Sequence, residues 1–307
     1  MKILLTGAFA YTKEQIAQIE SLGMNSVFMQ QEADTLPVKA SDVDAIVCNG
    51  LFLHHNIEDF DNLKYIQLTS AGFDRVPMEY VQRRQICIYN ARGVYSIPMA
   101  EFVLASVLQV YKKMEFFKEK QKQHEWNKHR ELLELYEKTV CIVGCGNVGT
   151  ECAKRFQAFG CRVLGVDIQP RKDAYYSRIE HLNKIDAIIE KADVIVLTLP
   201  LTEETKYLID ESRLCKMKKD AILVNISRGA IIDIKALLRT MDNLGGVILD
   251  VFEKEPLEEE SLLWDEKKVI ITPHNSFVGD GNKKRMKDVV IENIEKYLKE
   301  IQTNESR

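Results

Sequence analysis

Short runs of apolar residues, separated by more polar stretches, recur along the first third of the chain. The runs lie at residues 2–6, 26–29, 45–48, 65–68 and 86–89. Runs that are apolar throughout, rather than alternating, are typical of strands buried on both faces of a parallel sheet. The stretches between them have moderate helical periodicity, so the pattern predicts a parallel sheet covered by helices.

A longer segment with helical periodicity follows at residues 97–119. Pro98 suits the first turn of a helix, and apolar residues then recur on one face, so we expect a single long helix. Residues 112–130 are heavily charged, which is typical of a solvated face or arm. Aromatic residues within this charged stretch indicate a surface that packs on a partner: Phe116, Phe117 and Trp126.

A second series of apolar runs begins near Thr139. The six runs lie at residues 140–143, 162–166, 194–198, 221–226, 246–251 and 269–272. Six strands alternating with helices are expected of a complete doubly wound sheet that binds a dinucleotide. The amphipathic pattern at residues 282–301 predicts a final helix, which we expect to cross back onto the first part of the chain.

The first strand of the second series runs directly into the spacing G-x-G-x-x-G. Gly144 allows a tight turn, Gly146 lets the backbone approach a pyrophosphate, and Gly149 lets the following helix pack closely on the strand. The pyrophosphate then lies at the positive end of that helix. Asp167 ends the next strand, where a carboxylate accepts hydrogen bonds from the adenosine ribose diol. This order of features predicts a dinucleotide site.

Asp167 also bears on which cofactor is bound. A carboxylate repels the 2′-phosphate of NADP, so the sequence favours NAD. Arg171 and Lys172 follow a few residues later and would attract such a phosphate, which leaves NADP open as the alternative.

Composition narrows the class of protein further. The chain has 307 residues, of which 46% are hydrophobic and 29% charged, as expected of about two globular domains. The net charge of -4 argues against a nucleic-acid partner, and no apolar run is long enough to cross a membrane. The 7 cysteines include no C-x-x-C pair, which favours a reduced, cytoplasmic protein. The 6 histidines are scattered, so no metal site is expected.

Three side chains with complementary chemistry come one loop after each of the last three apolar runs. They are Arg228, Glu255 and His274. The carboxyl ends of parallel strands meet at one edge of a sheet, so we expect a cation, an anion and a titratable base at the edge that binds the nucleotide. Each residue alone also has a structural interpretation, as a surface arginine, a solvated acid or a capping histidine.

Taken together, these motifs resemble the D-isomer-specific 2-hydroxyacid dehydrogenase family, which includes phosphoglycerate dehydrogenases and glyoxylate or hydroxypyruvate reductases. The resemblance extends over essentially the whole chain. It rests on the glycine triplet and on residues 70–74, 100–101, 199–202 with Thr205, 225–229, 250–256 and 272–274.

The resemblance implies an α/β fold with two doubly wound parallel-sheet domains. A Rossmann NAD domain, residues 98–277, would be inserted into a flavodoxin-like substrate domain built from residues 1–97 and 278–307. Two copies of the chain would form a homodimer. The substrate would be a small 2-oxo or 2-hydroxy acid, with no nucleic-acid or membrane partner.

The family's catalytic roles then fall on residues of this chain. Arg228 would bind the substrate carboxylate and polarise the carbonyl, and His274 would donate or accept the proton when hydride is transferred. Glu255 would pair with His274, which favours imidazolium and holds the ring. The backbone amides of Ala71 and Gly72 would form a second clamp on the substrate carboxylate.

The resemblance also implies a set of cofactor contacts. Asp250 would meet the nicotinamide end, and the amides of Asn147 and Val148 would bind the pyrophosphate. The full expected set is Gly144, Gly146, Asn147, Val148, Gly149, Asp167, Pro200, Thr205, Ile226, Ser227, Arg228, Asp250, His274 and Ser276.

Two departures from the family pattern concern the substrate side. Asn275 and Ser276 stand where an apolar residue and a glycine or alanine are usual, and the loop at residues 49–56, expected to face the 2-substituent, matches no subfamily. We therefore expect an NAD-dependent oxidoreductase that interconverts a small D-2-hydroxy acid and its 2-oxo acid. The alternatives are phosphoglycerate dehydrogenase as the specific activity, and a non-catalytic, NAD(H)-sensing dimeric binding protein.

Overall fold

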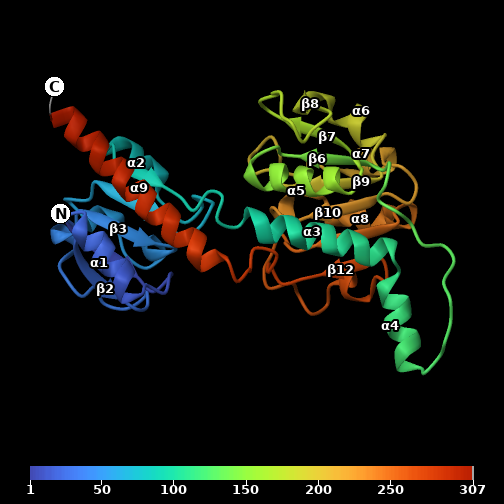
Figure 1. Cartoon of the computed structure of the whole chain (residues 1–307), viewed down its shortest axis with the longest axis horizontal. Helices are drawn as coiled ribbons and strands as arrows, with labels where there is room; N and C mark the ends of the chain where they lie inside the picture. The colour runs from blue at the N-terminus through green and yellow to red at the C-terminus, as the bar shows by residue number, and fades with distance from the viewer. Residues whose placement is uncertain (306–307) are drawn as a thin grey trace. The chain divides into compact units, whose positions relative to one another are not determined.

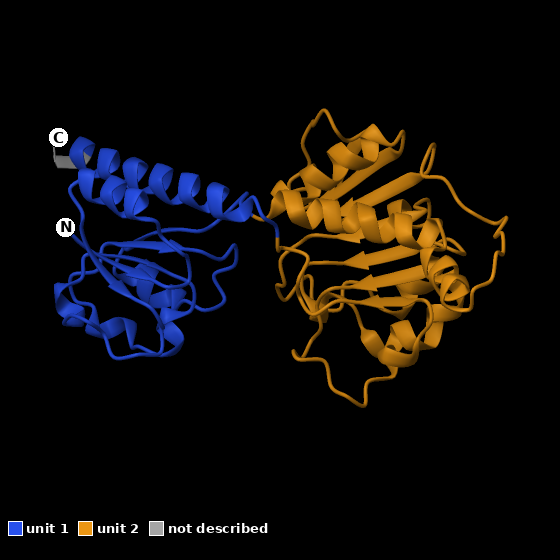
Figure 2. Cartoon of the chain, turned by 60° about the horizontal axis from the view of Figure 1, so that its bottom comes forward, with its two compact units in different colours: residues 1–94, 279–307 blue, residues 95–278 orange. Residues whose placement is uncertain are grey.

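A computed structural model describes residues 1–305 of the chain. These residues form two compact units (Figure 2). Unit 1 comprises Met1–Val94 together with the chain from Gly279 onward, and unit 2 comprises Tyr95–Val278. Within residues 1–305, no helix has both the length and the apolar character needed to cross a membrane.

Unit 1 is built on a parallel sheet with the strand order β2-β1-β3-β4-β5. The strands are β1 (Lys2–Thr6), β2 (Asn25–Met29), β3 (Ala45–Cys48), β4 (Tyr65–Leu68) and β5 (Cys87–Tyr89). This order is that of the flavodoxin-like fold, and the predicted parallel sheet is confirmed. Strands β3 and β4 are buried along their whole length, which is why their sequences are not alternating.

The helices of unit 1 come from both ends of the chain. They are α1 (Lys13–Ser21), α2 (Met78–Arg83) and α9 (Asn282–Glu305). Helix α9 packs beside α1 and β4. The ring of Tyr297 lies 4.6 Å from that of Tyr65, and Asn293 Nδ2 donates to Gln67 Oε1 at 2.9 Å. The expectation that the final helix returns to the first part of the chain is therefore confirmed.

Unit 2 is built on a parallel sheet with the order β12-β11-β10-β9-β6-β7-β8. The strands are β6 (Thr139–Val143), β7 (Arg162–Asp167), β8 (Arg178–His181), β9 (Val194–Leu197), β10 (Ile222–Asn225), β11 (Gly246–Leu249) and β12 (Val269–Ile271). The strands after β6 are added on one side of it as far as β8, and the chain then returns to add β9 on the other side. Ligands of such sheets bind beyond the carboxyl ends of the strands at the point where the strand order reverses, here between β6 and β9. Six strands were predicted; the edge strand β8 is additional.

The remaining helices belong to unit 2. They are α3 (Ser96–Tyr111), α4 (Met114–Lys122), α5 (Asn147–Ala158), α6 (Ile185–Ile189), α7 (Glu211–Lys216) and α8 (Ile234–Thr240). Short 3-10 helices occupy loops of both units: Ala40–Asp42, Leu51–Leu53, Ile57–Asp59, Leu182–Lys184, Gly229–Ile231, Met241–Asn243 and Leu262–Asp265.

The prediction of one continuous helix over residues 97–119 is wrong. The helix ends at Tyr111, and Lys113 adopts a left-handed backbone with φ 51° before α4 begins. Helix α3 packs against α5 through buried apolar residues, whereas α4 has no buried residue, so nothing holds the charged continuation in line. Figure 1 shows α4 projecting away from the sheet of unit 2.

Candidate functional site

The turn between β6 and α5 requires glycine at two of the three predicted positions. Gly144 has φ +94°, and a Cβ there would lie 2.7 Å from Leu199 N. A Cβ on Gly149 would lie 2.1 Å from the carbonyl oxygen of Gly144. At Gly146, by contrast, a Cβ would meet no described atom within 4 Å, so the space in front of the turn is open. This combination of tight packing behind and open space in front fits a bound pyrophosphate.

The amino end of α5 faces this open space. The helix begins at Asn147 with Gly146 as its N-cap, and no side chain caps it. The first N–H groups of a helix have no acceptor within the helix, so the first turn, which includes Val148, offers donors and a positive end to an anion. These features agree with the chemistry of a dinucleotide's pyrophosphate.

Asp167 is tied to the same turn. Its Oδ2 accepts a hydrogen bond from Cys145 N at 2.7 Å, and its Oδ1 accepts one from Gln169 N at 2.9 Å. The guanidinium of Arg171 donates to the carbonyl oxygen of Cys145. Asp167, which would bind a ribose diol, thus lies at the same corner of the turn as Arg171, which would bind a 2′-phosphate.

Cys145, inside the glycine triplet, is fully buried. Burial raises the pKa of its thiol to about 12, with the nearby charge of Asp167 acting in the same direction. The thiol therefore stays protonated at neutral pH. Cys145 is a small apolar residue of the turn rather than a reactive group.

A buried amide fixes the loop that carries Arg228. Asn225, 1% exposed at the end of β10, accepts hydrogen bonds from Ser227 N at 3.1 Å and from Ser227 Oγ at 2.9 Å. Its Nδ2 donates to the carbonyl oxygen of Arg228 at 2.9 Å. This role of Asn225 was not predicted from the sequence, although a polar residue that ends an apolar run was a usable signal.

A buried carboxylate fixes the loop that carries His274. Asp250 is fully buried after β11. Its Oδ1 accepts from Thr272 Oγ1 at 2.5 Å and from Asn275 N at 2.8 Å, and its Oδ2 accepts from Ser276 N at 3.0 Å. Both carboxylate oxygens therefore serve this loop, a function not anticipated from the sequence, which suggested only a nicotinamide contact.

The backbone of His274 is left-handed, with φ 51°, which is uncommon for a residue other than glycine. Its N–H donates to the carbonyl oxygen of Asp250 at 2.8 Å, so the unusual conformation is held by the same residue that binds the rest of the loop. Such conformations persist only where surrounding contacts determine them, and they occur often at functional sites.

The ring of His274 is held by Glu255. Glu255 Oε2 lies 2.8 Å from His274 Nδ1, and Glu255 Oε1 accepts a hydrogen bond from Phe252 N at 2.9 Å. The side chain of His274 is 43% exposed, and its Nε2 has no hydrogen-bond partner within residues 1–305. One ring nitrogen is thus fixed by a carboxylate while the other is open to a ligand, the arrangement that proton transfer requires.

The other expected cofactor residues differ in how available they are. Ile226 and Ser227 are buried beside Arg228, and Pro200 is exposed. The hydroxyl of Thr205 is already engaged, since it donates to the carbonyl oxygen of Pro200 at 2.8 Å. The hydroxyl of Ser276 is buried without a hydrogen-bond partner in the described part of the chain. A buried hydroxyl without a partner is costly, which favours a polar ligand group at this position.

The predicted substrate clamp lies in unit 1, in the loop after β4. The carbonyl oxygen of Ala71 accepts from Asn90 Nδ2 at 2.6 Å, and that of Gly72 accepts from Ser70 Oγ at 3.0 Å. The amides of Ala71 and Gly72 donate no hydrogen bond to any residue in 1–305. Their carbonyls are thus held while their N–H groups are left for a ligand, whereas Arg228, Glu255 and His274 all belong to unit 2.

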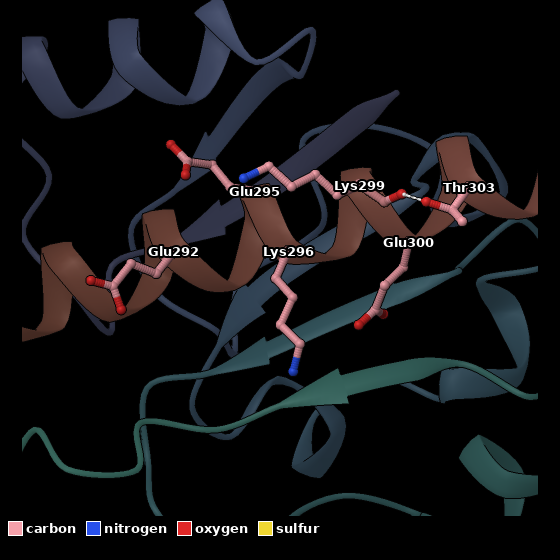
Figure 3. A pocket seen from close by; sticks show the side chains of 6 residues that line it. All are labelled: Glu292, Glu295, Lys296, Lys299, Glu300 and Thr303. Carbon is pink, nitrogen blue, oxygen red and sulfur yellow. Dashed lines mark hydrogen bonds between the residues drawn. The ribbon is translucent and has the colours of Figure 1, made fainter.

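A hollow in unit 1 does not combine free hydrogen-bond donors with a titratable base in the way that the candidate site does. It runs along α9 and is lined by charged side chains of that one helix (Figure 3): Glu292, Glu295, Lys296, Lys299 and Glu300, with Thr303. Two of these side chains contact β5, since Lys296 lies over the ring of Tyr89 and Glu300 accepts from its hydroxyl. They serve to dock α9. Within residues 1–305, no cluster of His, Cys, Asp and Glu is arranged to hold a metal ion.

Comparison with known proteins agrees with this geometry. Residues 104–276 match the family model described as D-isomer specific 2-hydroxyacid dehydrogenase, NAD binding domain. A D-3-phosphoglycerate dehydrogenase of Methanocaldococcus jannaschii is 32% identical over 97% of this chain, which spans 58% of that protein's length. A glyoxylate reductase of Thermofilum pendens is 33% identical over 78% of this chain and 73% of its own length.

A solved structure extends the similarity to the whole fold. A D-isomer specific 2-hydroxyacid dehydrogenase family protein from Aeromonas salmonicida has a TM-score of 0.82 to this chain at 28% identity. The alignment covers 97% of this chain and 95% of that one. With the family model matching more than half of its residues, the chain belongs to the D-isomer specific 2-hydroxyacid dehydrogenases, NAD-binding oxidoreductases that act on the CH–OH group of 2-hydroxy acids.

Proposed function

We propose that this protein reduces a small 2-oxo acid to the D-2-hydroxy acid with NADH, and catalyses the reverse reaction, using Arg228, Glu255 and His274. The observation that carries the proposal is the contact of 2.8 Å between Glu255 Oε2 and His274 Nδ1 at the carboxyl edge of the sheet that holds the dinucleotide turn. Family membership establishes the reaction class, and the contact supports His274 as the residue that exchanges the proton.

When bound, the nicotinamide of NADH supplies the hydride. His274 Nε2 donates a proton to the carbonyl oxygen of the 2-oxo acid, and in the reverse direction it accepts the proton of the hydroxyl group. Arg228 binds the substrate carboxylate through its planar guanidinium and stabilises the negative charge that builds up on the carbonyl oxygen. Asp250 and Asn225 hold the loops from which these two side chains extend.

The free amides of Ala71 and Gly72 support a second contact to the substrate carboxylate. In the cofactor site, Gly144, Gly146, Asn147, Val148 and Gly149 would receive the pyrophosphate. Of the other proposed contacts, Ser276 has the clearest capacity for a new hydrogen bond, because its buried hydroxyl has no partner in the described part of the chain. The other proposed contacts are those of Asp167, Pro200, Thr205, Ile226, Ser227 and Asp250.

We further propose a cytoplasmic homodimer. Trp126 is 95% exposed in the segment that follows α4, and tryptophan is enriched at protein–protein interfaces relative to the rest of the surface. Residues of this exposed segment therefore provide a surface for a second copy. We expect the Trp126→Ser variant to remain folded but to show a lower molar mass than the wild type in light scattering at micromolar concentration.

The reaction is tested by the loss of NADH absorbance with a panel of 2-oxo acids that includes glyoxylate, hydroxypyruvate, pyruvate and 3-phosphohydroxypyruvate. We expect turnover of at least one acid. We also expect His274→Ala and Arg228→Ala each to lower kcat/KM by about a hundredfold or more. Arg162→Ala, at the opposite edge of the sheet, is the control and should retain activity.

Two outcomes would contradict the proposal. NADH binding without turnover of any acid would favour the sensing protein as the alternative. Near-normal turnover by His274→Ala would remove the assigned proton donor while leaving the reaction class unchanged.

A further inference from the structure

The ring of His274 lies against a second side chain besides Glu255. The centroid of the Phe277 ring is 6.1 Å from that of the imidazole, and the two ring planes are inclined at 84°. One ring therefore presents its edge to the face of the other, an arrangement that aromatic pairs prefer at centroid distances of about 4.5–7 Å. Glu255 holds the imidazole through one nitrogen, and Phe277 packs on the same ring.

Phe277 is itself supported by Tyr95. Their ring centroids are 5.6 Å apart, and the ring planes are inclined at 85°. Tyr95 immediately precedes α3, and its carbonyl oxygen accepts the N–H of Met99, in the first turn of that helix, at 3.2 Å. Because α3 packs against α5 through buried apolar residues, the ring of Tyr95 is carried by the packed part of unit 2.

The backbone on both sides of Phe277 is also fixed. Ser276 N donates to Asp250 Oδ2 at 3.0 Å, and Val278 N donates to the carbonyl oxygen of Asn275 at 3.1 Å. Phe277 thus belongs to a turn that a buried carboxylate binds at its beginning. Phe277 is 38% exposed, so its ring lies at the surface of unit 2, beside the imidazole, rather than in the core.

The aromatic contact joins the two ends of unit 2. Tyr95 is the first residue of this unit, and Phe277 is the last but one. The whole series of contacting side chains is therefore complete within one compact unit. It consists of Tyr95, Phe277, His274 and Glu255.

A histidine that exchanges a proton must hold its ring in one orientation. Glu255 fixes the position of Nδ1, but a single hydrogen bond lets the ring swing about that contact. Both partners are also partly exposed, with 43% of the His274 side chain and 37% of the Glu255 side chain open to solvent. A second contact on the ring restricts this motion. Phe277 provides that contact and has no hydrogen-bonding group of its own with which to occupy Nε2.

We infer that Phe277, supported by Tyr95, is a positioning residue that holds the imidazole of His274 in the orientation for proton transfer. The inference rests on the proposed function, in which His274 exchanges the proton, and it adds two residues that act through His274. A base that is misplaced slows the chemical step while substrate and cofactor still bind, so the effect of losing the contact falls on kcat rather than on KM.

Steady-state kinetics, with the 2-oxo acid that is turned over fastest, separates this role from a structural one. In Phe277→Leu, which keeps an apolar side chain but no ring, we expect kcat to fall about tenfold, while KM for the acid and for NADH changes by less than about threefold. Phe277→Tyr keeps the ring, and its kcat should stay within about threefold of the wild-type value. Phe159→Leu, at an exposed phenylalanine that ends α5, is the control and should leave kcat unchanged.

Tyr95→Leu tests the support of Phe277. In the wild-type background we expect kcat to fall about threefold, because the Phe277 ring loses its neighbour. In the Phe277→Leu background the same substitution should lower kcat by no more than about 1.5-fold, since residues that act through one contact are not additive. Losses that multiply would show that Tyr95 affects the reaction by another route.

Proton NMR measures the contact independently of turnover. The chain has 6 histidines, and the Cε1–H signal of His274 is assigned by its absence from the spectrum of His274→Ala. The ring current of Phe277 acts on this proton, so the signal should move in Phe277→Leu and stay in place in Phe159→Leu. The Tm of each variant is measured in parallel to establish that it is folded.

Three results would overturn the inference. An unmoved His274 signal in Phe277→Leu would show that the rings are not in contact in solution. An unchanged kcat, or a higher KM with the same kcat, would remove Phe277 from the positioning of the base. Equal losses of kcat in Phe277→Tyr and Phe277→Leu would show that the ring is not what matters. A wild type that turns over no 2-oxo acid would instead contradict the proposed function, and the NMR signal would still report whether Phe277 holds the ring.

Discussion

Glu255 joins the backbone of its own loop to the ring of His274. One carboxylate oxygen accepts the N–H of Phe252 at 2.9 Å, and the other lies 2.8 Å from His274 Nδ1. An amide has a single oxygen, so Glu255→Gln cannot accept from both groups. We expect kcat to fall by about 10- to 100-fold with little change in KM, because the proton donor is misplaced while substrate binding persists.

Steady-state kinetics with Glu255→Gln and Glu259→Gln separates this effect from a general loss of negative charge, since Glu259 is an exposed acid of the same segment. A large increase in KM with unchanged kcat would assign Glu255 to substrate binding instead.

Asp250 connects stability and activity in one residue. Replacing it with asparagine places an NH₂ group opposite a hydroxyl or amide donor of the 272–276 loop in a fully buried position. Leaving a buried donor unsatisfied costs about 1–3 kcal/mol, so Asp250→Asn should lower the free energy of unfolding by about that amount. Because this loop carries His274, kcat should also fall.

Chemical denaturation and kinetics on the same sample check both effects. Asp280→Asn is a control at a less buried acid of the chain. Full activity in Asp250→Asn would show that the loop keeps its conformation without the carboxylate.

Asp167 predicts a preference for NADH over NADPH. In Asp167→Ser the repulsion of a 2′-phosphate is removed while Arg171 remains at the turn, so the ratio of kcat/KM for NADPH to that for NADH should rise by about tenfold or more. The Tm must be measured in parallel, because Asp167 also accepts the N–H of Cys145. A wild type that prefers NADPH would contradict the assignment.

Asp186 predicts a pH dependence of stability. The hydrogen bond from Lys216 and that from Arg213 lower the pKa of its carboxyl below the ordinary value. A lowered folded-state pKa means that the stabilisation is fully present above the pKa of the unfolded chain, about 4, and is lost as pH falls through the folded-state pKa. The side chain is 40% exposed, so the contribution should be within about 1 kcal/mol.

Thermal unfolding of the wild type and Asp186→Asn should therefore differ at pH 7 and converge as the pH is lowered below about 4. A difference that grows on acidification would contradict the assigned ion pair.

Most strands could be predicted because buried parallel strands are continuous apolar runs. Strand β8 was missed since only Ile179 of its four residues is buried, and it pairs with β7 alone at the edge of the sheet. The break at Lys113 was equally invisible, because a lysine with positive φ has no signature comparable to that of glycine.

At the candidate site, the sequence identified residue types and their order but not their hydrogen bonds. The closeness of Glu255 and His274 follows from parallel strands that end at one edge. The left-handed backbone of His274 and the use of both Asp250 oxygens depend on the path of a loop, which no local pattern encodes.

The allocation of groups between the two units has a consequence for how relatives diverge. The hydrogen-bonded pair of Glu255 and His274 lies wholly within unit 2, whereas Glu32 and the loop that it holds belong to unit 1. Substitutions in one set therefore leave the hydrogen bonds of the other untouched. A lineage can thus alter the loop after β3, near the beginning of its gene, without rebuilding the contact between Glu255 and His274.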